Sequence, residues 1–203
     1  LSEKLRPYLD AMLHNMDAVA DIDLTVEKAG LAKKYGGVMP RLTEASLRME
    51  DMINPQIADV LEEKGKRFTP VSIALEKGAT VITGANMGGK SVALKTIALN
   101  ILLTQRGFFP FAAAAEVPLF DSMHIISEDL ESIDRGLSSF GGEIVRFNQV
   151  IRRLPEGFAF ILLDEFARGT NPDEGAAIVQ AVTSYLNGAN AVTVLATHYT
   201  SAM

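Results

Sequence analysis

Apolar residues recur at steps of three and four near the start of the chain. This spacing predicts a helical region from residue 2 to about residue 34. Its apolar face consists of Leu5, Leu9, Met12, Leu13, Met16, Val19 and Ala20. We expect the helix to stop at Tyr35-Gly36-Gly37, because glycine commonly follows the last helical turn. The pattern therefore divides the chain into a helical segment, residues 1–40, and a second domain, residues 41–203.

The pattern changes twice after this helix. Between residues 41 and 68 it is mixed, with an extended piece at 46–49, a turn at Asn54-Pro55 and a charged stretch at 62–67 that we interpret as a solvated turn. After Pro70, short apolar runs alternate with amphipathic stretches. The runs predict strands at 79–83, 123–127, 158–163 and 191–196, and the stretches predict helices at 91–105, 142–153 and 172–186. Such alternation indicates an α/β fold, with a mainly parallel sheet flanked by helices.

Composition limits the class of protein. With 203 residues, 48% of them hydrophobic, the chain can fill the core of one α/β domain. It has no cysteine, which excludes disulfides and thiolate metal sites and fits a reducing, cytoplasmic location. The formal net charge is −6. Domains that grip a phosphate backbone usually carry the opposite sign, so other domains should hold any nucleic acid.

Residues 175–203 contain no Lys, Arg, Asp or Glu, and a hydropathy scan could mistake them for a membrane span. Polar residues such as Gln180, Thr183 and Asn187 interrupt the segment too often for that. A buried helix, a turn and a strand explain it better. We therefore expect no membrane-spanning segment.

Residues 84–91 fit the pattern G-x-x-x-x-G-K-[ST], and they lie between a predicted strand and a predicted helix. The eight residues are Gly84, Ala85, Asn86, Met87, Gly88, Gly89, Lys90 and Ser91. Glycines let the backbone aim its N–H groups at phosphate oxygens, and the following helix adds the positive end of its dipole. Lys90 would neutralise the β- and γ-phosphates, and Ser91 would offer a hydroxyl to Mg²⁺. A glycine-rich turn with an incidental lysine is the less favoured alternative.

Two adjacent carboxylates, Asp164 and Glu165, follow the apolar run that ends at Leu163. Ligands of open α/β sheets bind at the carboxyl ends of the strands. Successive side chains at a strand end point in different directions, so Asp164 can face the Mg²⁺ while Glu165 polarises the attacking water. Such a pair alone often marks only a strand end. Its position after a phosphate loop favours a catalytic role.

Two further features concern the γ-phosphate. His198 follows the last predicted strand and would donate a hydrogen bond in the transition state, although a lone His after a strand is more often incidental. Residues 137–143 open a helix with the hydroxyls of Ser138 and Ser139. That helix start could bind the phosphate of another subunit's nucleotide, or it could be an ordinary serine cap. The spacing leaves both interpretations open.

Taken together, these motifs resemble the ATPase domain of the MutS family, which has an ABC-type P-loop fold. They are the phosphate loop with Asn86-Met87-Gly88, Asp164-Glu165, the Ser138-Ser139-Phe140 helix start, Arg168-Gly169-Thr170 and Thr197-His198-Tyr199. The resemblance implies ATP and Mg²⁺ as ligands. It also implies a homodimer, or a MutS-like heterodimer, in which Ser138 and Ser139 complete the partner's ATP site. It places Phe68 against the adenine, whereas the pattern alone would put Phe68 in the core.

Departures from the family pattern affect the expected function. Asn54 stands where the family commonly has His, and Ala85 where it has Pro. Residues 91–96 and 169–175 look nearer to divergent MutS paralogues. The leading expectation is a mismatch-repair ATPase whose dimer closure is coupled to mismatched DNA, held by domains outside this chain. The alternatives are a chaperone that reactivates a cobalamin-dependent aminomutase, and a branched-DNA or ribosome-associated paralogue.

Overall fold

A computed structural model describes residues 2–84, 89–127, 139–154, 157–168 and 170–199, and all structural statements below concern these residues. The chain starts with α1 (Ser2–Leu5), a short 3₁₀ turn (Arg6–Tyr8) and the long helix α2 (Leu9–Tyr35). α2 ends at Gly36, whose φ of 68° allows its N–H to bond the carbonyl of Ala32. The predicted helix and its stop are therefore confirmed.

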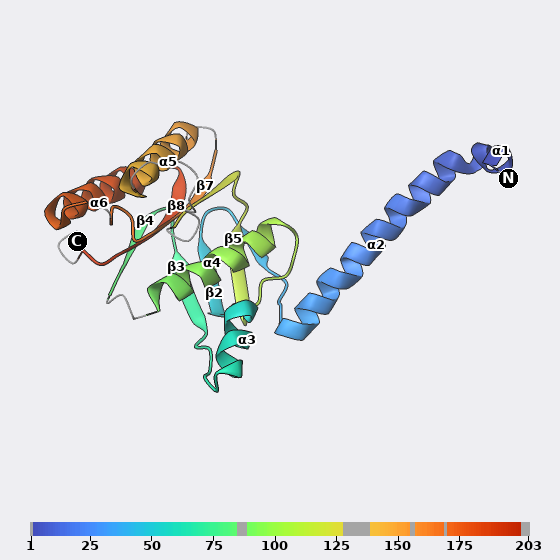
Figure 1. Cartoon of the computed structure of the whole chain (residues 1–203), viewed down its shortest axis with the longest axis horizontal. Helices are drawn as coiled ribbons and strands as arrows, with labels where there is room; N and C mark the ends of the chain where they lie inside the picture. Colours follow the sequence, from blue (N-terminus) through green and yellow to red (C-terminus); the bar gives the residue numbers. More distant parts are fainter. Residues whose placement is uncertain (1, 85–88, 128–138, 155–156, 169, 200–203) are drawn as a thin grey trace.

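The predicted apolar face of α2 is not covered within this chain. Figure 1 shows α2 running away from the rest of the molecule. Among the described side chains of α2, only Ala32 is buried. Contacts are confined to the base of the helix, where the ring of Tyr35 lies 5.2 Å from that of Phe111. The division at residues 1–40 and 41–203 stays a prediction.

The core of the molecule is a four-stranded parallel sheet in the order β4-β8-β7-β6. Its strands are β4 (Gly78–Thr83), β6 (Ser122–Ile126), β7 (Ala159–Asp164) and β8 (Ala191–Thr197). All residues of β7 and β8 are buried. Continuous apolar runs are typical of strands covered on both faces, which explains why the sequence pattern predicted β7 and β8.

Helices and a second sheet cover the two faces of this parallel sheet. Alternate residues of β7, such as Ile161 and Leu163, pack in one cluster with α5 (Ser139–Arg153) and α6 (Pro172–Asn187). Phe160 and Leu162 point the other way, into a cluster with α4 (Lys90–Gln105) and the second sheet. The α/β class with a parallel sheet flanked by helices is therefore confirmed.

The sequence pattern largely missed the second sheet, which has the order β1-β5-β2-β3. Its strands are β1 (Arg41–Thr43), β2 (Leu47–Met52), β3 (Val71–Leu75) and β5 (Ala114–Pro118). β1 and β5 are parallel, and the other pairs are antiparallel. Only the extended piece at 46–49 was predicted. The turn predicted at Asn54-Pro55 is instead the start of α3 (Pro55–Glu63), where the Asn54 side chain accepts a bond from the N–H of Ile57.

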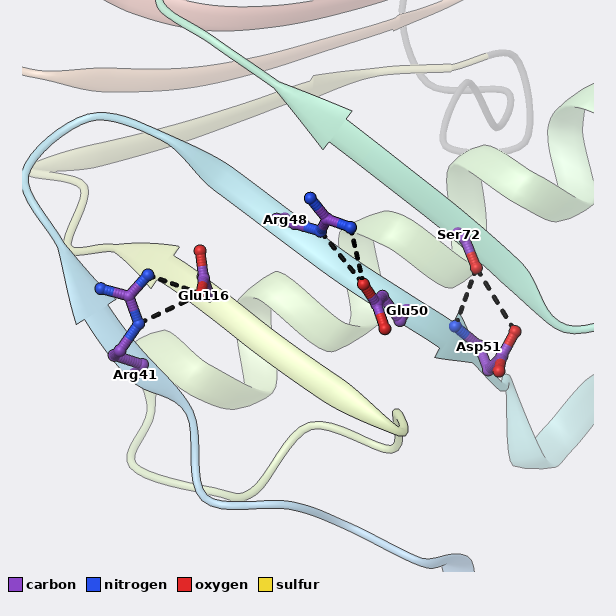
Figure 2. A network of polar contacts seen from close by, with 6 residues as sticks. All are labelled: Arg41, Arg48, Glu50, Asp51, Ser72 and Glu116. Carbon is purple, nitrogen blue, oxygen red and sulfur yellow. Dashed lines mark hydrogen bonds and ion pairs between the residues drawn. The ribbon is translucent and has the colours of Figure 1, made fainter.

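Charged side chains cover the outer face of the second sheet (Figure 2). Arg41 pairs with Glu116, and Arg48 pairs with Glu50 at 2.9 Å. Beside them the backbone N–H of Asp51, a residue with a φ of 50°, donates to Ser72 Oγ at the point where the β2–β3 register shifts. These four side chains are exposed, so this face of the sheet is solvated, and ion pairs of this kind contribute little stability.

Among the described residues, no helix is both long and apolar enough to cross a bilayer. The described part of the uncharged segment, residues 175–199, forms most of α6 and all of β8.

Candidate active site

The predicted phosphate loop lies between β4 and α4, at the carboxyl edge of the parallel sheet. Ala85, Asn86, Met87 and Gly88 lie outside the described residues. Gly89 precedes α4 with a φ of 80°, a conformation that favours glycine. Lys90 is buried, and its Nζ donates a hydrogen bond to the carbonyl of Gly84. The Lys90 side chain therefore reaches back to Gly84, the residue that follows β4.

Ser91 and Asp164 meet at this edge. Ser91 lies in the first turn of α4, and its Oγ donates a hydrogen bond of 3.4 Å to Oδ1 of Asp164, the last residue of β7. The Asp164 side chain is buried. A hydroxyl and a carboxylate are oxygen donors of the kind that Mg²⁺ prefers. The two residues therefore fit the predicted metal site.

Glu165 begins a sharply bent segment after β7. Its φ is 52°, which is uncommon for a residue with a side chain, and its N–H donates a hydrogen bond of 3.0 Å to the carbonyl of Ala196 on β8. Because of this conformation, the Glu165 side chain does not continue the alternating side-chain directions of β7. Its Oε2 lies 2.9 Å from Nη1 of Arg168, and the carboxylate side chain is 14% exposed.

His198 lies at the same edge, because β8 stands between β4 and β7 in the sheet. His198 directly follows the last residue of β8 and is exposed. Its ring lies 4.2 Å from the ring of Tyr199, centroid to centroid. The strand order thus brings Gly84, Glu165 and His198 to the ends of three neighbouring strands.

The remaining predicted residues are placed only in part. α5 begins at Ser139, as the predicted helix start requires, but Ser138 and the side chain of Ser139 lie outside what the structure describes. Phe68 lies in the connection between α3 and β3 and is partly buried. It belongs to neither of the two apolar clusters.

Two buried residues near the site, Glu143 and Tyr199, belong to motifs found in the sequence but were assigned no role there. Glu143 of α5 accepts a hydrogen bond of 2.9 Å from the N–H of Ala167, and the hydroxyl of Tyr199 donates one of 3.0 Å to the carbonyl of Ala167. Burial raises the pKa of the Tyr199 phenol, and the charge of Glu143 raises it further, so the hydroxyl keeps its proton. The sequence offers one signal for Glu143, since it is an acidic residue on the apolar face formed by Phe140, Ile144 and Phe147.

Comparison with known proteins identifies relatives of this chain. A family model described as MutS domain V matches residues 80–203. Proteins named Endonuclease MutS2 are similar over 98% of the chain, with 34% identity in Geobacillus sp. (strain WCH70) and 35% in Symbiobacterium thermophilum. Another, from Thermomicrobium roseum, is 34% identical. The chain spans only 25 to 26% of the length of these relatives.

Proposed function

Because the chain belongs to the MutS family and carries its ATPase domain, we propose that it binds ATP with Mg²⁺ and hydrolyses it to ADP and phosphate. The observation that supports this most is the meeting of Ser91 with Asp164 next to Lys90 and Glu165, at one edge of a parallel sheet. These residues come from separate segments of the chain, and ATP hydrolysis accounts for all of them.

Lys90 and the start of α4 would bind the phosphates. The Nζ of Lys90 already lies in the loop and would exchange the Gly84 carbonyl for β- and γ-phosphate oxygens. Backbone N–H groups at the start of α4 point toward the same place, because the first turn of a helix leaves them without helical partners. Ser91 and Asp164 would hold the Mg²⁺, which supplies charge neutralisation on the phosphates when bound.

Glu165 would act as the general base. Glu165 follows Asp164 directly, but its positive φ points its carboxylate in a different direction. There it would accept the proton of the attacking water. In the structure, the Arg168 guanidinium holds this carboxylate at 2.9 Å. His198, at the end of the neighbouring strand, would donate a hydrogen bond to charge that develops on the γ-phosphate.

We further propose that two copies share their ATP sites, as a homodimer or in a MutS-like heterodimer. α5 begins at Ser139, so the preceding Ser138 would stand at a helix start where backbone N–H groups favour an anion. In this proposal the Ser138-Ser139 segment caps the γ-phosphate of the partner's nucleotide. Phe68, which is only partly buried, would stack on the adenine of its own subunit.

The client of the ATPase is proposed to be DNA, bound by other parts of the protein. The relatives' name, Endonuclease MutS2, favours a nucleic-acid client over a cobalamin-dependent aminomutase. The net charge of −6 argues against DNA binding by this chain itself. Mismatched duplex is the first candidate substrate. A branched-DNA or ribosomal client is the second, because residues 91–96 and 169–175 resemble divergent MutS paralogues.

The test is the ATPase rate and DNA affinity of the full-length protein with mismatched, matched and four-way branched DNA at one salt concentration, since salt alone changes such affinities. Selective stimulation by the mismatch would support a repair sensor. Selective binding of the branched form would support the second candidate. An ATPase rate that none of the three DNAs changes, with no selective DNA binding, would reject DNA as the client but would not contradict the proposed ATP hydrolysis.

A further inference from the structure

The segment that carries Glu165 has an unusual backbone. Glu165 and Ala167 have φ values of 52° and 65°, although neither is glycine. Such conformations persist only where the surrounding structure fixes them. Contacts on both sides of Glu165 provide this fixing, and those on its carboxyl side come largely from one helix, α5.

On the amino side, the N–H of Glu165 is bonded to the Ala196 carbonyl of β8. On the carboxyl side, the ring of Phe166 lies 5.2 Å from the ring of Phe147 of α5, and Phe166 is 1% exposed. The next residue, Ala167, gives its N–H to Glu143 of the same helix. The position of the Glu165 carboxylate is therefore tied to α5.

The Glu143 contact is buried and supported from a second direction. Glu143 is 5% exposed and Ala167 is fully buried. The hydroxyl of Tyr199 donates a hydrogen bond to the carbonyl of Ala167. Tyr199 directly follows His198 in the chain. Gly175 of α6 makes room for that ring, since a Cβ at this position would clash with the hydroxyl and the adjoining ring carbons of Tyr199.

We propose that Glu143 is a positioning residue for hydrolysis, which holds Glu165 of its own subunit through the N–H of Ala167. This inference rests on the proposed function, in which the start of α5 serves the partner's ATP. Because Glu143 lies about one turn after that start, α5 connects the nucleotide bound by the partner with the general base of its own subunit.

Substitution of Glu143 in the full-length protein tests this role. Glu143→Ala removes the acceptor of the Ala167 N–H, and we expect kcat to fall about 10- to 100-fold while the KM for ATP stays nearly unchanged. Glu143→Gln keeps an oxygen acceptor of the same reach and should restore most of kcat. Gln149→Ala, at an exposed position on the same helix, is the matched control. A wild-type kcat in Glu143→Ala would overturn the inference.

A loss of folding is distinguished by two further measurements. Hydrogen exchange of the segment 165–167 should become faster in Glu143→Ala and stay slow in Glu143→Gln, while exchange in β7 and β8 should not change. Tyr199→Phe removes only a hydroxyl and should lower kcat in the same direction. Equal loss of kcat in Glu143→Gln and Glu143→Ala, with exchange at 165–167 unchanged, would also overturn the inference.

Mixed dimers show which site Glu143 serves. One subunit carries Glu165→Gln, so that only the other subunit's Glu165 can act. Glu143→Ala in the subunit with the intact Glu165 should slow hydrolysis, whereas the same change in the Glu165→Gln subunit should leave it near the control rate. The reverse pattern would mean that Glu143 acts through the partner's site, and would contradict the inference. Absence of ATP turnover in the wild-type protein would instead reject the proposed function.

Discussion

Ser91 Oγ donates a hydrogen bond of 3.4 Å to Asp164 Oδ1, although 73 positions separate the two residues in the chain. The contact arises because α4 starts where β4 ends, and β7 stands near β4 in the same parallel sheet with only β8 between them. The contact places the Asp164 carboxylate beside the hydroxyl of Ser91, the last residue of the phosphate-loop pattern at 84–91. The fold therefore brings together two oxygen donors that are far apart in the sequence, as the proposed Mg²⁺ site requires.

Replacement of Ser91 should weaken the use of Mg²⁺. In Ser91→Ala one oxygen donor is lost while Asp164 and the fold stay intact, so the Mg²⁺ concentration for half-maximal ATPase rate should rise by about 10-fold or more. A Mg²⁺ titration at saturating ATP measures this. Ser184→Ala, at an exposed position on α6, is the control. An unchanged Mg²⁺ requirement in Ser91→Ala would remove Ser91 from the metal site.

Asn100 should be critical for stability. Its side chain is fully buried in α4, donates to the carbonyls of Ile53 and Thr96, and accepts a hydrogen bond of 2.7 Å from the N–H of Phe111. Asn100→Leu would leave the N–H of Phe111 and the carbonyl of Ile53 buried without this partner. Each such group costs about 1–3 kcal/mol, so the free energy of unfolding should fall by roughly 2–5 kcal/mol in chemical denaturation.

A matched comparison for Asn100 is Asn148 of α5, which is exposed. Asn148→Leu should change the free energy of unfolding by less than about 0.5 kcal/mol, because surface substitutions away from special contacts rarely do more. Similar losses in both variants would show that the hydrogen bonds of Asn100 are not what stabilises this part of the molecule.

His124 should make the fold sensitive to mild acid. Burial lowers the pKa of this imidazole below its usual value of 6.5, and the positive charge of Arg153 lowers it further. Because the folded state binds the proton less tightly than the unfolded chain, the stabilising effect is present above pH 6.5 and is lost as the pH falls through the folded pKa. The free energy of unfolding should therefore decrease below pH 6.5.

Substitution isolates this contribution of His124. In His124→Asn the decrease in unfolding free energy below pH 6.5 should become smaller, as measured by denaturation at a series of pH values. His14→Asn, at an exposed position on α2, controls for the loss of an imidazole. An identical pH dependence in wild type and His124→Asn would show that another group causes the acid sensitivity.

The sequence predicted the parallel sheet well and the second sheet poorly, for a physical reason. β7 and β8 are buried on both faces and appear as continuous apolar runs. β2 alternates the buried Leu47 and Met49 with the charged Arg48 and Glu50 over only a few residues, and such a short pattern is ambiguous. α3 was missed although Asn54 and Pro55 form a typical helix start.

The candidate site divides in the same way. The placement of Lys90, Ser91, Asp164 and Glu165 at one edge of the sheet could be predicted, because local spacing along the chain puts them at the end of a predicted strand or the start of a predicted helix. The contact of Glu143 with Ala167 could not be predicted, since only the packing of α5 against the end of β7 creates it. Contacts between elements that are distant in the sequence are difficult to predict from local sequence patterns.

We propose that the residues at the edge of the parallel sheet hydrolyse ATP, with Glu165 as the base. The most direct test is steady-state turnover and ATP binding in the full-length protein with Glu165→Gln, beside Lys90→Ala. We predict that Glu165→Gln binds ATP but turns over roughly 10²- to 10⁴-fold more slowly, and that Lys90→Ala loses the nucleotide. Normal steady-state turnover in Glu165→Gln would contradict the account.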